Sequence, residues 1–412
     1  MSKLDDLIRG LCPDGVEYKK LGEIATISRG GNFQKKDFLT EGVPCIHYGQ
    51  IYTKYGLFAD KTFTFISEEC AKKQKMAQPN DIVMAVTSEN IEDVCKCLAW
   101  LGDEPVAVSG HSAIIHHNQN AQYLVYYFHS QMFFAQKRKL AHGTKVIEVT
   151  PDALVDIVLP IPPLEIQREI VRILDNFTNL TAELTAELTA RKTQYAYYRD
   201  KLLKAETNAH KYKLGEIATV TKLAGFEFTN YVTYSENGNI IALRGLNVKN
   251  GRLDLHDVKY VDKSDFSKLE RSKLHIGDML FTYVGTIGQV AIVDEEDKYY
   301  LAPNVALIRC DKEALLPQYM KYYFQTTRFW DKQIRRLLQS SSMQNIPMEK
   351  IRKFEIAVPP LDVQNRIVNV LDNFEKICSD LNIGLPAEIE ARQKQYEYYR
   401  DKLLTFKEVA AT

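Results

Sequence analysis

Residues 162–177 read PPLEIQREIVRILDNF, and residues 359–374 read PPLDVQNRIVNVLDNF. This segment therefore occurs twice, about 200 residues apart, a spacing far longer than the period of a solenoid or a propeller. The segments around it are repeated as well. LGEIAT stands at residues 21–26 and 214–219, and ARKTQYAYYRDKLL at 190–203 returns as ARQKQYEYYRDKLL at 391–404. The chain is thus a duplication.

The stretches between the repeated segments have diverged. Residues 29–122 and 222–318 share little. Only weak similarities remain between the two stretches. NDIVM around Asp81 is similar to GDMLF around Asp278, and YYF occurs at residues 126–128 and 322–324. A duplicated active site would keep its polar residues in both copies. A scaffold that presents two different binding surfaces predicts the pattern seen here.

The repeated segments are expected to be helical. Residues 164–214 contain no Gly or Pro, and apolar side chains recur at gaps of three and four, with Arg191 as the one polar member of this seam. Roughly forty such residues would form a rod of about 60 Å. In the second copy Gly384 and Pro386 interrupt the helix, which then resumes. We expect the two seams to pair as an antiparallel coiled coil, because each alone would leave an apolar stripe in water.

The diverged parts predict mixed α/β domains. Short β-rich runs lie between Gly- and Asn-containing turns at residues 81–86, 113–116, 278–283, 290–293 and 305–308. A helical stretch is expected to close each part, over residues 124–140 and 319–338, before a Pro-rich elbow. The predicted fold class is therefore mixed α+β, with two globular α/β domains in a pseudo-twofold repeat, separated by the paired helices. We place the domains at residues 1–160 and 211–357, and the helical spacers at 161–210 and 358–412.

Composition narrows the class of function. The 53 basic and 53 acidic side chains give a formal charge of zero, which argues against a large nonspecific nucleic-acid binder but allows local basic faces. Seven scattered cysteines include no pair of CxxC motifs and suit a reduced, cytoplasmic setting. The N-terminus reads MSKLDDLIRGL, so no signal peptide is expected, and no stretch is apolar enough for a membrane span.

Taken together, LGEIA, a variable α/β part, a Pro-Pro-Leu elbow and a helix ending QYxYYRDKLL, all occurring twice, resemble the specificity subunits of type I restriction-modification enzymes. The resemblance covers essentially the whole chain. The tetrapeptide TAEL, at residues 181–184 and 185–188, is similar to the spacer repeat of the IC-type subfamily.

The resemblance implies a division of labour. Each target-recognition domain would read one half of a bipartite, asymmetric site on double-stranded DNA, and the helices would set the gap between the halves. Two modification subunits, which carry S-adenosylmethionine and methylate adenine, would dock on the helices. ATP-dependent restriction subunits would join that complex. The chain itself would bind no cofactor and catalyse no reaction.

The residues agree with a non-catalytic role. The sequence contains no Walker A loop, no strand-linked GxGxxG and no Asn/Asp-Pro-Pro-aromatic tetrad, which disfavours a self-sufficient methyltransferase. His116 and His117 end an apolar run without further metal-ligand spacing, which favours a satisfied or solvated pair over a metal site. A coiled-coil adaptor that binds only proteins would explain the helices but not two diverged α/β parts. A dimeric transcription factor usually carries identical domains.

Candidate DNA contacts lie in the loops of the diverged parts. Arg, Lys, Asn and Gln discriminate base edges, and Lys, Arg, Ser and Thr hold phosphates. In the first part the candidates are Ser28, Arg29, Asn32, Lys35, His47, Tyr48, Gln50, Lys54, Ser88, His111, Thr144 and Lys145. In the second they are Lys222, Arg244, Asn247, Lys249, Arg252, Thr286, Asn304, Ser341, Gln344 and Asn345. Each could instead be an ordinary polar turn residue. The basic runs at 137–139 and 335–336 suit a solvated helix face as well as phosphate contact.

The repeated helix ends supply candidate partner contacts. Four tyrosines are expected to be buried in the helix pair, namely Tyr195, Tyr198, Tyr396 and Tyr399. Tyr197, Arg199, Tyr398 and Arg400 are left on other faces of the helices. Because they recur in both copies, a repeated surface for a partner is favoured over simple solubility.

Overall fold

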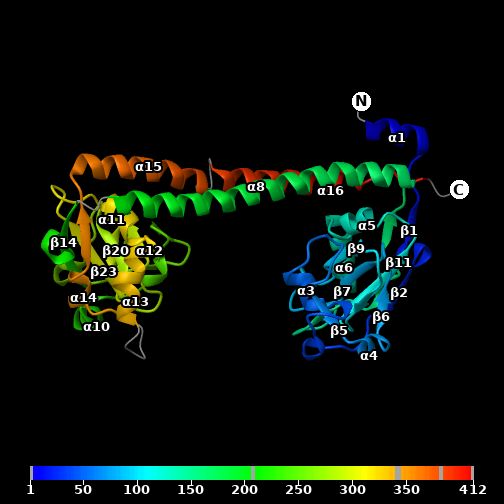
Figure 1. The fold of residues 1–412 in the computed structure, drawn as a ribbon, viewed down its shortest axis with the longest axis horizontal. Helices are drawn as coiled ribbons and strands as arrows, with labels where there is room; N and C mark the ends of the chain where they lie inside the picture. Colours follow the sequence, from blue (N-terminus) through cyan, green and yellow to red (C-terminus); the bar gives the residue numbers. More distant parts are fainter. Residues whose placement is uncertain (1–2, 206–208, 339–344, 380–383, 410–412) are drawn as a thin grey trace. The chain divides into compact units, whose positions relative to one another are not determined.

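The computed structural model describes residues 3–205, 209–338, 345–379 and 384–409. The chain forms two compact units. The first unit joins Met1–Leu184 to Ile389–Thr412, and the second unit is Thr185–Glu388. The predicted mixed α+β fold, with two repeated domains and a long helix, is confirmed (Figure 1). The predicted division into four segments stays a prediction.

Two sheets form the α/β part of the first unit. One holds, in order, β2 (Ala25–Arg29), β11 (Ser112–His117), β7 (Ile82–Ala85), β9 (Cys97–Trp100) and β4 (Phe58–Ala59). The other holds β5 (Thr64–Ile66), β3 (Val43–Ile46), β10 (Val106–Val108) and β6 (Lys75–Ala77). Strands β7 and β9 are buried along their whole length, which is why IVMA and CLAW are continuous apolar runs rather than alternating ones.

The second unit repeats this plan. One sheet holds β15 (Ala218–Lys222), β23 (Val305–Cys310), β20 (Met279–Thr282) and β21 (Val290–Ile292). The other holds β19 (Lys259–Tyr260), β16 (Ile241–Leu243) and β22 (Tyr299–Leu301). In both units the smaller sheet contains one parallel pair, β3 with β10 and β16 with β22. The diverged sequences therefore keep one arrangement of strands.

Helix α8 (Leu164–Ala205) is continuous over 42 residues, as the sequence predicts. The second copy forms α15 (Leu361–Ser379) and α16 (Leu385–Leu403). In the second unit α8 and α15 run antiparallel: Tyr198 stacks on Phe374, with ring centroids 5.9 Å apart, and Cys378, further along α15, lies near Lys192, earlier on α8. In the first unit Phe177 of α8 stacks on Tyr399 of α16 at 5.4 Å. An equivalent Phe–Tyr stack thus packs the helix pair of each unit.

The helical stretch that closes each α/β part is divided into shorter helices. Residues 124–140 form two helices, α5 (Ala121–Phe128) and α6 (Gln131–Leu140). The Oγ of Ser130 accepts a hydrogen bond from the Phe133 amide at 3.2 Å and caps a new helix. In the second unit α11 (Pro317–Phe324) ends before Thr326, whose Oγ1 caps α12 (Thr327–Phe329) in the same way. A π-helical turn (Trp330–Ile334) and α13 (Arg335–Leu338) follow. Both predicted stretches are thus helical, and a hydroxyl cap restarts the helix within each.

A buried glutamine clamps each α/β part to its long helix. Gln167 and Gln364, in the two Pro-Pro-Leu elbows, are fully buried. The Nε2 of Gln364 donates to the carbonyls of Ala314 and Pro359, each at 2.8 Å, and its Oε1 accepts from the Leu316 amide at 2.9 Å. Gln167 makes the equivalent bonds to the Pro162 carbonyl, the Gln119 side chain and the Asn120 amide. All hydrogen-bonding groups of the clamp are satisfied internally.

A second connection between each α/β part and its long helix involves the YYF sequence that occurs in both halves. The Tyr126 hydroxyl, on α5, donates to Asp175 of α8 at 2.6 Å, and Tyr322 on α11 donates to Asp372 of α15. Both tyrosines are buried, and burial raises the pKa of both phenols, so they stay protonated donors. Paired short strands complete the junction, β1 (Tyr18–Lys20) with β13 (Val158–Pro160) and β14 (His210–Lys213) with β24 (Glu355–Val358). The same bonds join domain and helix twice.

Candidate nucleic-acid interface

In the first unit the predicted loops converge at one end of the sheets. Arg29, at the end of β2, donates to the Gly110 carbonyl at 2.9 Å and forms an ion pair with Glu148. The Tyr48 amide, just after β3, donates to Ser109 Oγ at 2.8 Å. Strand β8 (Thr87–Ser88) pairs with β12 (Ile147–Glu148), which brings the 142–148 loop alongside. These contacts bring loops that are distant in sequence next to one another.

A glycine lets two of these loops touch. A Cβ at Gly30 would lie 2.3 Å from the Ser109 carbonyl oxygen, so no larger residue fits there. The neighbouring Gly31 amide donates to the Val108 carbonyl at 2.7 Å. The RGGN sequence is thus required by close packing, and it holds the Arg29 and Asn32 loop against strand β10.

The candidates of the first unit differ in exposure. The exposed ones are Ser28, Arg29, Asn32, Lys35, Lys54, His111, Thr144 and Lys145. Tyr48 and Ser88 are half-buried. His47 and Gln50 are buried, at 8% and 6% exposed. Exposed cations and amides of this set are placed where a duplex could reach them, whereas His47 and Gln50 are not.

His47 and Gln50 belong to the frame of the loop. Gln50 Oε1 accepts from the His47 amide at 3.0 Å, and its Nε2 donates to Thr64 Oγ1 at 3.1 Å. His47 lies against Phe38 with centroids 5.6 Å apart, and its Nδ1 accepts from the Gly49 amide. Burial lowers the pKa of His47, so the ring is neutral. The expectation that both side chains face outward is corrected: they cap α3 (Tyr48–Thr53).

In the second unit four candidates line one hollow of about 740 Å³. Arg244, Lys249, Thr286 and Asn304 share it with the aromatic rings of Phe228 and Tyr234. Asn304 has φ of +71°, a left-handed conformation that asparagine tolerates in turns. Cations, an amide and aromatic faces in one concave surface are the groups that contact base edges and phosphates.

The remaining candidates of the second unit lie apart from this hollow. Lys222 is exposed at the end of β15, the position that Arg29 occupies at the end of β2. Arg252 is exposed and approaches Glu375, with 3.7 Å between Nε and Oε1. Asn345 is exposed. Ser341 and Gln344 lie outside the described residues.

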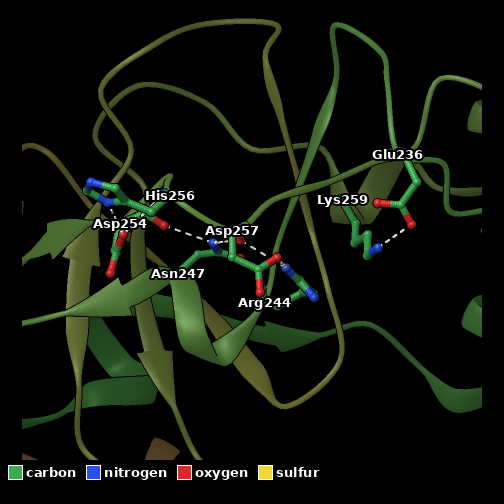
Figure 2. A network of polar contacts seen from close by, with 7 residues as sticks. All are labelled: Glu236, Arg244, Asn247, Asp254, His256, Asp257 and Lys259. Carbon is green, nitrogen blue, oxygen red and sulfur yellow. Dashed lines mark hydrogen bonds and ion pairs between the residues drawn. The ribbon is translucent and has the colours of Figure 1, made fainter. Parts of the chain in front are cut away.

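Asn247 is a frame residue rather than an exposed one. It is fully buried, and its Oδ1 accepts from the Arg244 amide at 3.1 Å. Its Nδ2 donates to the carbonyls of Asp254 and Asp257, at 2.8 and 2.7 Å (Figure 2). Asn247 therefore repeats in the second unit the capping role of Gln50, and its predicted outward placement is likewise corrected. Sequence reasoning missed Asp254 and Asp257, whose loop this amide holds.

Lys249 is tied to the same loop. Its Nζ lies 2.6 Å from Asp254 Oδ2. His256 Nδ1 lies 2.8 Å from the other carboxylate oxygen (Figure 2). The bond from Lys249, which has the larger effect, and the bond from His256 hold the pKa of Asp254 below its usual range. The carboxylate therefore remains charged and keeps Lys249 beside the hollow.

The predicted partner residues separate into two kinds. Tyr197 and Tyr398 are 61% and 60% exposed, and Lys201 and Lys402 each lie 5.8 Å from the ring centroid of the neighbouring tyrosine. Arg400 is only 7% exposed and bonds Asp401, which accepts from the Gln131 amide at the start of α6. In the second unit Arg199 pairs with Asp200 in the same way, and the Asp200 carboxylate accepts a hydrogen bond from the Thr327 amide. Arg400 is thus buried and Arg199 half-buried, and each belongs to an Arg–Asp brace whose aspartate bonds the α/β part. The assignment of both arginines to a partner surface stays a prediction.

Lys137 and His116 also bond other residues of the first unit, whereas the buried Nε2 of His117 has no partner in the part of the chain that the structure describes. The Nζ of Lys137, in the basic run on α6, donates to the carbonyls of Glu92 and Val94, at 2.8 and 2.6 Å, and burial lowers its pKa. His116 Nδ1 lies 2.6 Å from Asp81 Oδ1. Burial lowers the pKa of His117 to about 4. In the described ranges no cluster of three or more His, Cys, Asp or Glu could hold a metal ion.

Known proteins share this organisation. Residues 13–191 and 206–391 each match the type I restriction modification DNA specificity domain. The chain belongs to this family. A putative type I restriction enzyme specificity subunit from Haemophilus influenzae is 30% identical over 98% of both chains. The EcoR124I/EcoR124II specificity subunit of Escherichia coli is 35% identical over 60% of this chain and 61% of its own length.

Solved structures of type I systems share the fold of this specificity-family chain. A chain from a study of complex assembly and conformational transition of the type I R-M system aligns with a TM-score of 0.63 and 15% identity, covering 96% of this chain and 98% of its own. The S subunit from M. genitalium aligns at 0.50 with 12% identity, covering 95% and 96%. Over the described parts of the chain, no helix has the length and apolar character needed to cross a membrane.

Proposed function

We propose that this chain is the DNA-reading subunit of a type I restriction-modification complex, in which each unit reads one half of a bipartite, asymmetric site. The observation that carries the proposal is a contrast within the molecule. The elbow glutamines, the Tyr–Asp bonds and the Arg–Asp braces recur in both units, whereas the loops that the sheets present differ. Two units that share the same contacts between α/β part and helix but present different loops suit two different half-sites.

The charges of the loops support contact with a duplex. Arg29, Lys35, Lys54 and Lys145 are exposed in the first unit, and Lys222 and Lys249 in the second. Phosphate contacts by such cations supply most of the nonspecific affinity for DNA. Because the formal charge of the chain is zero, we expect partner subunits to supply further phosphate contacts.

The helices supply a surface for partners. The exposed Tyr197 and Tyr398, each with a lysine over its ring, form two copies of one patch. Two copies of a patch suit two copies of the same partner. We assign these patches to two modification subunits, which carry S-adenosylmethionine and methylate adenine. ATP-dependent restriction subunits would then join the complex.

In this proposal the chain itself binds no cofactor and catalyses no reaction. It would act in the cytoplasm, a setting that its seven unpaired cysteines suit. An adaptor that binds only proteins would need the helix pair. It would not need two α/β parts that are joined to the helices by the same contacts but carry different loops.

Mapping N6-methyladenine across the host genome tests the proposal. We expect one split, asymmetric motif that disappears when the gene for this chain is deleted and returns with a plasmid copy. A motif that survives the deletion, or a continuous palindrome, would contradict the reading of two half-sites.

A matched pair of lysine variants tests the loop surface directly. Lys54→Ala removes an exposed loop cation of the first unit, and Lys394→Ala removes an exposed lysine on α16 that pairs with Glu390. In the assembled complex only Lys54→Ala should weaken binding to a duplex carrying the motif and reduce the salt slope by about one. Equal effects of the two variants on DNA binding would contradict a specific role of the loop surface in contacting DNA.

A further inference from the structure

Arg244 and His47 occupy the same place in the two units. Each is the first residue after the strand of a parallel pair, β16 in the second unit and β3 in the first. Each also donates its backbone amide to a capping side chain three residues later, at 3.1 Å to Asn247 and 3.0 Å to Gln50. The backbone is equivalent, but the side chains differ.

The surroundings of these two residues differ as well. His47 is enclosed by aromatic rings and 8% exposed, so nothing outside the protein can contact it. Arg244 instead lines the hollow that also holds Lys249, Thr286 and Asn304. At this position, therefore, only the second unit presents a cation to a ligand.

The guanidinium of Arg244 is held in one orientation. Its Nη2 donates to the Asp257 carboxylate at 2.8 Å and to the Asp257 carbonyl at 2.9 Å (Figure 2). Asn247 holds the same carbonyl at 2.7 Å. Bonds of this kind orient a recognition group before its ligand arrives and lower the entropic cost of binding.

The bonds leave part of the guanidinium unused. Across the described residues, Nη1 and Nε of Arg244 have no acceptor. Nε is buried and out of reach of a ligand, so Nη1 is the donor that remains available to one. The Asp257 side chain is 68% exposed and can return to water when a ligand takes its place.

We propose that Arg244 reads a guanine in the half-site of the second unit, by donating from Nη1 and Nη2 to O6 and N7 in the major groove. This inference rests on the proposed function. Arginine pairs with those two acceptors in the commonest specific contact between proteins and DNA. Nη2 keeps its bond to the Asp257 carbonyl and transfers the other one from the carboxylate to the base. Asp257 is a positioning residue, and because it balances the charge of Arg244, a lone phosphate gains little there.

The test maps N6-methyladenine in cells that carry Arg244→Lys in the full chain with its natural partners. Lysine keeps the charge and can still pair with Asp257 but lacks the planar fork. We expect the split motif to persist, with preference for one guanine in one half lowered by about 5- to 150-fold. Asp257→Asn should relax the same position and no other, which a merely structural role would not do. Lys259→Ala, which removes the ion pair with Glu236, is the matched control and should leave the motif unchanged.

The outcomes separate this inference from the proposed function. A split motif that keeps every base in the Arg244→Lys cells, with methylation equal to wild type or uniformly weaker, would overturn the guanine assignment and leave the proposed function standing. Relaxation in both halves, or at several positions, would also overturn the assignment. The absence of a split motif in wild-type cells would instead remove the proposed function itself. Thermal unfolding of the purified variants controls for loss of fold.

Discussion

Replacing the elbow glutamine Gln364 with alanine should destabilise the second unit, beginning where its α/β part joins α15. The substitution removes the three hydrogen bonds to Ala314, Pro359 and Leu316, all at 2.8–2.9 Å and in a fully buried position. At about 1 kcal/mol net for each bond, the second unit should lose about 3 kcal/mol of unfolding free energy. For a unit of this size, that loss corresponds to a fall in Tm of about 6–12 °C.

The measurement combines calorimetry with amide hydrogen exchange. Exchange should accelerate in the peptide that contains Leu316, because its amide loses the acceptor Oε1. Gln364→Met fills the same space without hydrogen bonds, so it should cost about as much as alanine. Asn365→Ala is the matched control, since Asn365 is exposed and bonds only the Leu361 carbonyl of its own helix. A loss below about 1 kcal/mol for both Gln364 variants would refute the clamp.

Four further predictions address spacing, modularity, assembly and stability. Inserting a third TAEL after Leu188 should lengthen α8 by about 6 Å and the unread gap by roughly one to two base pairs, with the specified bases unchanged, as methylome sequencing would show; an unaltered gap would contradict this. Exchanging residues 29–158 for those of a relative should change one half of the methylated motif, and a change in both halves would refute one domain for one half-site. Tyr197→Ala with Tyr398→Ala should weaken assembly with the modification subunit on gel filtration, while calorimetry shows an unchanged fold. Arg400→Ala should instead lower the stability of the first unit, and full stability would contradict its role as a brace.

The sequence was most informative about the frame. Helix α8 could be predicted because its signals are local: no Gly or Pro over its length and apolar residues at gaps of three and four. The duplication then extended each interpretation to the second copy. The breaks within the two closing helical stretches were not predicted, because Ser130 and Thr326 each act through one local bond inside a pattern that otherwise stays helical.

The junction could not be predicted because its partners are far apart in sequence. Tyr126 and Asp175 are separated by 49 residues, and nothing in YYF or LDNF shows that they meet. Each segment was recognised as an echo or a repeat, but only the folded chain brings the phenol to the carboxylate. Recurrence of the two motifs at nearly the same separation, 49 residues in the first half and 50 in the second, is the signal that could have paired them.

The candidate surface was predicted as loops more accurately than as side chains. Polar residues were expected to point outward, yet Gln50, Asn247 and Arg400 are buried, since backbone groups and carboxylates from elsewhere satisfy them. The shared cue was spacing: Gln50 and Asn247 each stand four residues after the last residue of a strand, at the N3 position of the short helix that follows, where a capping side chain is expected. Which loop residues contact DNA stays a prediction.

The composition of the first unit has a consequence for the order in which the protein is made. This unit is completed by the last residues of the chain: Val16 forms a β-bridge with Glu408, and the Tyr18 hydroxyl donates to the Phe406 carbonyl at 3.1 Å. A ribosome adding 5–20 residues per second needs about 10–40 s to travel from Leu184 to Ile389. Throughout that time the N-terminal part waits with its helix face uncovered. A premature stop near the C-terminus would therefore disable the part of the protein that was synthesised first.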